Sequence, residues 1–141
     1  MQATRSRLTV AATMLVALGL LLTPSVSASS PLQAFHLAKT CDGLGTCTVT
    51  SSDAGPLPPG TIETYLGPQF GDPVLSSRVV ITSSYGGGGT AVGHCVWPLR
   101  TATGICTFAG GTGSLAGFHA NLTVSANTDF SVFYWDGSYR L

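Results

Sequence analysis

The sequence has 141 residues, of which 44% are hydrophobic and only 9% are charged, and its formal net charge is zero. So few charges leave no basic patch for nucleic acid and no polybasic segment for anionic lipid. The many Val, Leu, Phe and Tyr residues exclude a disordered chain, which would be poor in apolar side chains. These features predict a folded protein that binds no nucleic acid.

The first 28 residues are predicted to form a secretory signal peptide. Arg5 and Arg7 precede the apolar run LTVAATMLVALGLLLTP, and Val26 and Ala28 occupy the small-residue positions that a signal peptidase requires. We expect cleavage after Ala28, a secreted, extracellular protein and no membrane contact after cleavage. A transmembrane anchor is the alternative, because the run is near the lower limit of roughly 17 residues for crossing a bilayer.

Residues 29–141 are predicted to form one domain, since domains commonly have ~100–200 residues. This part of the chain carries four basic and six acidic side chains, a net charge of −2. Its length allows a real but modest hydrophobic core.

Short runs rich in Val, Thr, Ile, Phe and Tyr fill this domain, bounded by Gly, Pro, Ser, Asn and Asp. No run has a sustained 3.6-residue apolar period, so strands and turns are favoured over helices. Eight strands are predicted, at residues 32–38, 46–52, 61–67, 74–83, 90–98, 104–110, 116–126 and 129–141. Eight short strands at regular spacing indicate a β-sandwich or an up-and-down barrel.

All four cysteines lie in this domain, and an even number in an exported chain suggests disulfides. In a hairpin centred between residues 100 and 101, Cys95 and Cys106 lie directly opposite each other, within disulfide reach. The glycine turn DGLGT brings Cys41 and Cys47 together in the same way. We therefore predict the disulfides Cys41–Cys47 and Cys95–Cys106. A zinc site is the rival interpretation, but the spacings do not match paired zinc knuckles.

The glycine-rich stretch GGTG, residues 110–113, has two interpretations. GTGSLA fits the letters of a dinucleotide-binding loop, but that site needs a following helix, and the next residues alternate like a strand. In FHANLTVSA, Phe118, Ala120, Leu122 and Val124 share one face. We therefore predict that GGTG is a hairpin turn, where glycine supplies positive φ and leaves no Cβ between adjacent chains.

The segments KTCDG, CTVTSS, GHC, GTGSLAGFHA and WDGSY together resemble those of small secreted actinobacterial members of the allene oxide cyclase and dirigent-like β-barrels. The resemblance covers most of residues 29–141. It implies a single eight-stranded antiparallel barrel with a lipocalin-like (calycin-like) shape. Plant relatives bind small lipophilic molecules in the barrel and steer cyclisation or radical coupling. Their catalytic residues match no motif in this sequence, so the resemblance assigns none.

Candidate site residues are few. His36, His94 and His119 show no metal-ligand spacing, so we predict no metal and no cofactor. The chain has no G-x-S-x-G nucleophile motif, and the catalytic residues, if there are any, stay unassigned. Asp136 is expected to lie in a turn, because Asp-Gly is a strong turn pair. A pocket could be lined by Trp97, Tyr134, Trp135 and His119, and further by Tyr65 and Tyr139, although aromatic side chains are as often core residues.

Two functions stay open, and enzyme activity is left undecided. The first is a secreted, disulfide-stapled barrel that binds a small apolar molecule or a surface partner. The second is a cyclase or isomerase whose pocket folds a lipophilic substrate. A protease inhibitor using the loop around Arg100 is a reserve interpretation. The aromatic C-terminal strand is also a candidate contact in a homo-oligomer.

Overall fold

The computed structural model describes residues 30–71, 74–98 and 100–141. The predicted signal peptide, residues 1–28, lies outside the described residues. The described chain forms eight strands and one short 3₁₀ turn, and no helix in it is long and apolar enough to cross a membrane. The elements are β1 (Gln33–Cys41), β2 (Thr46–Ser52), β3 (Ile62–Gly71), β4 (Val74–Ser83), η1 (Tyr85–Gly87), β5 (Gly89–Pro98), β6 (Thr103–Gly113), β7 (His119–Ala126) and β8 (Phe133–Arg140).

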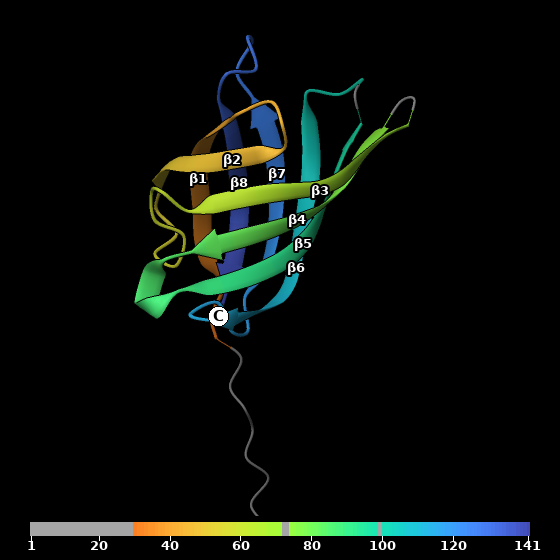
Figure 1. Cartoon of the computed structure of the whole chain (residues 1–141). Coiled ribbons are helices and arrows are strands. Elements are labelled where there is room, and N and C mark those ends of the chain that lie inside the picture. Colours follow the sequence, from red (N-terminus) through yellow and green to blue (C-terminus); the bar gives the residue numbers. More distant parts are fainter. Residues whose placement is uncertain (1–29, 72–73, 99) are drawn as a thin grey trace, which may run out of the picture.

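The strands form a closed barrel in which each strand pairs antiparallel with the next and β8 pairs with β1 (Figure 1). This confirms the predicted eight-stranded antiparallel barrel and resolves the choice between sandwich and barrel. Closure removes the exposed strand edges on which another chain could pair. All eight predicted strands are present, and their boundaries differ from the predicted ones by a few residues.

The alternation of side chains along each strand fills the inside of the barrel. In β7, Ala120, Leu122 and Val124 are buried, and the residues between them are exposed. This confirms the predicted apolar face of that strand. Successive side chains of a strand point to opposite faces, so one face of each strand lines the barrel interior.

One end of the barrel is closed by packed side chains. Leu57, Leu115 and Phe118, from the connections between β2 and β3 and between β6 and β7, are all completely buried in the core. Aromatic rings from β1, β6 and β8 pack with Phe118 and with one another at centroid distances of 5.4–6.4 Å. The half of the barrel next to these two connections, called the lower half below, is therefore a solid core.

The GGTG stretch lies inside β6 and is not the hairpin turn, so that prediction was wrong in position. The turn itself is formed by residues 114–117. Gly111 is needed in the strand because a Cβ there would lie 2.3 Å from the Leu115 carbonyl oxygen and 2.6 Å from the Thr90 carbonyl oxygen. As expected, glycine is needed because a neighbouring backbone approaches closely. Here the neighbours are the turn that follows β6 and the adjacent strand β5.

Asp136 and Gly137 also lie within a strand, β8, and not in a turn as predicted. A Cβ on Gly137 would lie 2.2 Å from the carbonyl oxygen of Asn121 on the neighbouring β7. Asp136 points outward, where its carboxylate lies 2.8 Å from Nδ1 of His36 on β1. In this chain Gly137 therefore allows β7 and β8 to lie close together, and Asp136 binds His36 on the outer face.

Candidate functional site

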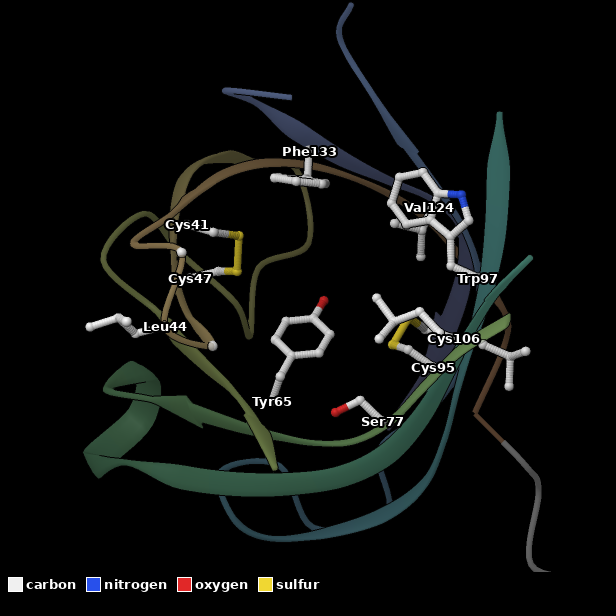
Figure 2. A pocket seen from close by; sticks show the side chains of 14 residues that line it. Cys41, Leu44, Cys47, Tyr65, Ser77, Cys95, Trp97, Cys106, Val124 and Phe133 are labelled. Carbon is white, nitrogen blue, oxygen red and sulfur yellow. A yellow bond between two sulfur atoms is a disulfide. The ribbon is translucent and has the colours of Figure 1, made fainter. Parts of the chain in front are cut away.

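The upper half of the barrel contains a cavity of about 340 Å³. It lies at the end where β1 turns into β2, and Figure 2 shows it with the side chains that line it. The wall is almost entirely apolar and is formed by Cys41, Gly43, Leu44, Gly45, Cys47, Tyr65, Leu75, Ser77, Cys95, Val96, Trp97, Cys106, Val124 and Phe133. An eight-stranded barrel is just wide enough to be filled by its own side chains or to hold one small ligand. In this barrel, packed side chains fill one half, and the other half contains the cavity.

Both predicted disulfides, Cys41–Cys47 and Cys95–Cys106, are present, and both line the cavity. Each joins directly opposed residues of neighbouring strands, β1 with β2 and β5 with β6. Figure 2 shows them on different sides of the cavity. The disulfides add apolar surface to the cavity wall, and each cross-links the two strands of one hairpin.

A second, outer hollow of about 500 Å³ adjoins the cavity. The two share Leu75, Trp97 and Phe133, and the rings of Trp97 and Phe133 meet edge to face with centroids 6.1 Å apart. Phe130, whose φ of +56° is unusual for a residue with a side chain, lines the outer hollow and is 64% exposed. The cavity and the outer hollow therefore adjoin at Leu75 and the Trp97–Phe133 pair.

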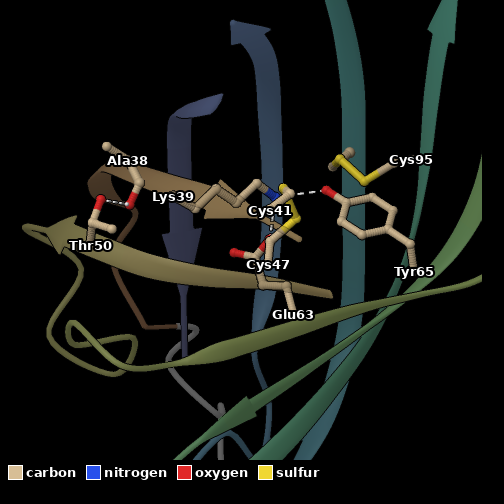
Figure 3. Close-up of polar contacts among 9 residues, drawn as sticks. Ala38, Lys39, Cys41, Cys47, Thr50, Glu63, Tyr65 and Cys95 are labelled. Carbon is tan, nitrogen blue, oxygen red and sulfur yellow. Dashed lines mark hydrogen bonds and ion pairs between the residues drawn. A yellow bond between two sulfur atoms is a disulfide. The ribbon is translucent and has the colours of Figure 1, made fainter. Parts of the chain in front are cut away.

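The only lysine and the only glutamate of the whole sequence form an ion pair inside the barrel. Lys39 on β1 and Glu63 on β3 are 1% and 0% exposed. The Lys39 ammonium contacts Glu63 Oε2 and donates to the Tyr65 hydroxyl oxygen at 2.7 Å, as Figure 3 shows. It also lies 3.5 Å from the centroid of the Trp135 ring, a cation–π contact.

Burial dominates the electrostatics of this cluster. It lowers the pKa of Lys39 to about 8 and raises the pKa of Glu63, while the attraction between the two partly opposes both shifts. Glu63 Oε1 is buried without a hydrogen-bond partner among the described residues. Such a pair is costly to place in a core, because desolvation offsets the attraction between the charges. The cluster therefore calls for a role other than simple stabilisation.

Tyr65 connects the ion pair to the cavity. Its ring belongs to the cavity wall, and Figure 2 shows the hydroxyl pointing into the middle of the barrel. Its oxygen accepts a hydrogen bond from Lys39, and the structure shows no acceptor for its own hydrogen within the described chain. Burial, reinforced by the charge of Glu63, raises the pKa of Tyr65, so the hydroxyl keeps its proton.

The residues predicted to line a pocket fall in three places. Trp97 lines the cavity, and Trp135 lies in the closed core beside Lys39, outside the cavity wall. Tyr134 and His119 lie on the outer face of the barrel, where both are exposed. The reason is strand alternation, since Tyr134 precedes the inward Trp135 and His119 precedes the inward Ala120.

Lys39 and Glu63 were not predicted as site residues. The signal for them was present in the alternation, because Lys39 continues the inward series Phe35 and Leu37, and Glu63 lies between Thr61 and Tyr65 on the same face. Their status as the single lysine and single glutamate would have strengthened that signal.

The three histidines all lie on the outer face. His36 pairs with Asp136, which is the main reason why the pKa of His36 is raised, and His94 lies 2.9 Å from the Ser76 hydroxyl. Within residues 30–141, as far as they are described, no three His, Cys, Asp or Glu side chains are grouped to hold a metal ion.

Comparison with known proteins identifies no relative: no protein-family model, no curated protein and no solved structure matches the chain. The cavity and the ion pair beneath it therefore carry the functional inference.

Proposed function

We propose that the protein is a secreted, disulfide-stapled β-barrel that binds a small apolar molecule in the cavity at the β1–β2 end. The observation that carries this proposal is the contrast between a packed lower core and an apolar cavity of about 340 Å³ above it. Ligand sites commonly measure roughly 300–1,000 Å³ and combine apolar walls with a few polar groups. The adjoining outer hollow gives a longer molecule further room.

Two further features support the proposal. Both disulfides suit an oxidising, extracellular environment, in agreement with the predicted signal peptide. The resemblance to allene oxide cyclase and dirigent-like barrels, whose plant members bind lipophilic molecules in the barrel, points the same way.

A second candidate function is that of a barrel-pocket cyclase or isomerase. It is favoured by one observation, the Tyr65 hydroxyl that faces the cavity with the Lys39–Glu63 pair behind it. A hydroxyl held beside a buried ammonium is suited to stabilise charge that develops on a bound substrate oxygen. The confining apolar wall would fix the substrate's conformation.

The binding proposal is tested by titrating the protein with N-phenyl-1-naphthylamine, a neutral fluorophore that brightens in apolar surroundings. We expect saturable binding of one molecule per chain. Val124→Trp fills the cavity and should abolish this binding. Thr123→Trp, one residue earlier in β7 and on the outer face, is the matched control and should bind like the wild type.

Loss of binding counts only if both variants unfold cooperatively and keep both disulfides. If the wild type gives no saturable signal, or if Val124→Trp binds like the wild type, the cavity is not a ligand site. To distinguish a cyclase or isomerase from a binding protein, a bound lipophilic compound is recovered after incubation and identified. An enzyme returns a changed isomer, and a binding protein returns the same compound.

A further inference from the structure

Few side chains of the cavity wall can donate a hydrogen bond to a ligand. Tyr65, Ser77 and Trp97 are the described wall residues whose side chains carry an N–H or O–H group. The Ser77 hydroxyl donates to the Arg78 carbonyl oxygen at 3.1 Å, and the Trp97 indole N–H donates to the Thr101 carbonyl oxygen at 3.1 Å. Among these three side chains, only Tyr65 has a hydrogen left to donate.

The Lys39–Tyr65 contact prepares this hydroxyl to donate. The phenol oxygen already accepts a hydrogen bond from the Lys39 ammonium at 2.7 Å. Hydrogen bonds in a chain polarise one another, and the effect is larger inside a protein than in water. The Tyr65 O–H is therefore a stronger donor than an isolated phenol, and it faces a cavity with an otherwise apolar wall (Figure 2).

We propose that the molecule bound in the cavity is neutral and apolar and carries a carbonyl oxygen at its inner end, which accepts a hydrogen bond from Tyr65. This inference rests on the proposed binding function and adds the chemical class of the ligand. A carbonyl oxygen supplies an acceptor for the Tyr65 O–H, for which the described residues provide none.

The charges below the cavity favour a neutral carbonyl over a carboxylate. The positive charge of Lys39 is already matched by Glu63, which it contacts directly. A ligand carboxylate would therefore enter an apolar cavity without a counter-charge of its own, and burying an uncompensated charge is costly. A ketone, aldehyde or ester meets the same donor without that cost.

The test compares 2-undecanone with undecane, two molecules of similar shape that differ in one carbonyl group, by displacement of N-phenyl-1-naphthylamine. We expect the wild type to bind the ketone about 3–10-fold more tightly, as one added net hydrogen bond would give. Tyr65→Phe should lose this preference and keep its affinity for undecane. Ser77→Ala, which removes the other hydroxyl of the wall, should keep the preference.

A second measurement decides the matter even if Tyr65→Phe does not fold. The carbonyl stretching band of ¹³C-labelled 2-undecanone should move to lower frequency on binding to the wild type than it has in a hydrocarbon solvent. An unshifted band, or equal affinity for ketone and hydrocarbon, would overturn the carbonyl assignment while leaving apolar binding intact. If the probe itself does not bind saturably to the wild type, the proposed binding function fails. If the probe binds but neither compound displaces it, the carbonyl assignment fails and the binding function stands.

Discussion

At the scale of residues, the barrel interior contains one group of side chains that its apolar surroundings disfavour. Lys39 and Glu63 are buried together, and Tyr65, which lines the cavity, accepts a hydrogen bond from Lys39. Elsewhere the described core is built of apolar and aromatic side chains with a few hydroxyls. The placement of this pair directly below the cavity is the strongest local sign of function.

Removing one member of the pair should destabilise the fold strongly. Lys39→Met leaves Glu63 buried without a counter-charge, and we expect the free energy of unfolding to fall by about 3–5 kcal/mol. The double variant Lys39→Met/Glu63→Met should recover most of that loss, because apolar groups of similar size can replace a buried pair. Urea unfolding of the three proteins measures this, and equal losses in the single and double variants would show that the charges are not coupled.

The same pair predicts an unusual dependence of stability on pH. Burial lowers the pKa of Lys39 from 10.5 to about 8, so between pH 8 and 10 the unfolded chain holds a proton that the folded chain lacks. Stability rises with pH wherever the unfolded state binds more protons, so the contribution of Lys39 rises in this window. The raised pKa of Glu63 has the opposite sign, and its contribution falls as the pH rises above its ordinary value of 4.5.

The unfolding free energy of the wild type, relative to Lys39→Met/Glu63→Met, should therefore decrease from acid toward neutral pH and increase again from pH 8 to 10. Urea midpoints measured from pH 4 to 10 test this. A difference between the two proteins that stays constant with pH would contradict the buried titration.

At the scale of elements, the strands follow from sequence patterns, whereas the details of their pairing do not. The alternation in β7 and the turn centred between residues 100 and 101 were sufficient to predict a strand face and the Cys95–Cys106 pair. GGTG was predicted to be a turn but lies in β6, because glycine is used both in tight turns and where strands approach closely. The meeting of Lys39 and Glu63 depends on the registers of β1, β2 and β3 together, including a shift in register between Ala38 and Lys39.

The close contact at Gly111 gives a test of the β5–β6 pairing. Gly111→Ala would place a methyl group against two backbone carbonyl groups, which cannot move aside as a flexible side chain could. We therefore expect the free energy of unfolding to fall by about 1–3 kcal/mol. Gly55→Ala is the matched control, because nothing lies within 4 Å of its Cβ position, and it should change stability by less than about 0.5 kcal/mol. Thermal or urea unfolding compares the two, and equal stability would mean that the approach at Gly111 is looser than described.

At the scale of the whole molecule, the barrel is divided into a solid half and a hollow half. Connections at one end bury Leu57 and Leu115 completely, while the other end opens between two disulfides and the Trp97–Phe133 pair. The strand pattern left a sandwich or a barrel open, and the family resemblance favoured the closed barrel that is observed. The cysteine positions predicted both disulfides, but nothing in the sequence indicated which part of the interior is hollow. Cavity volume depends on how side chains from all eight strands meet, and such contacts are set by the fold as a whole.

The central claim, that the hollow half holds an apolar ligand, is tested most directly by native mass spectrometry of the protein purified from its natural host. Wild type and Val124→Trp should be prepared side by side in that host. We predict that the wild type carries the extra mass of one small molecule per chain, which is lost on denaturation, and that the cavity-filled variant is bare. Identical spectra for the two proteins would contradict the claim and would move the search for function to the outer surface of the barrel.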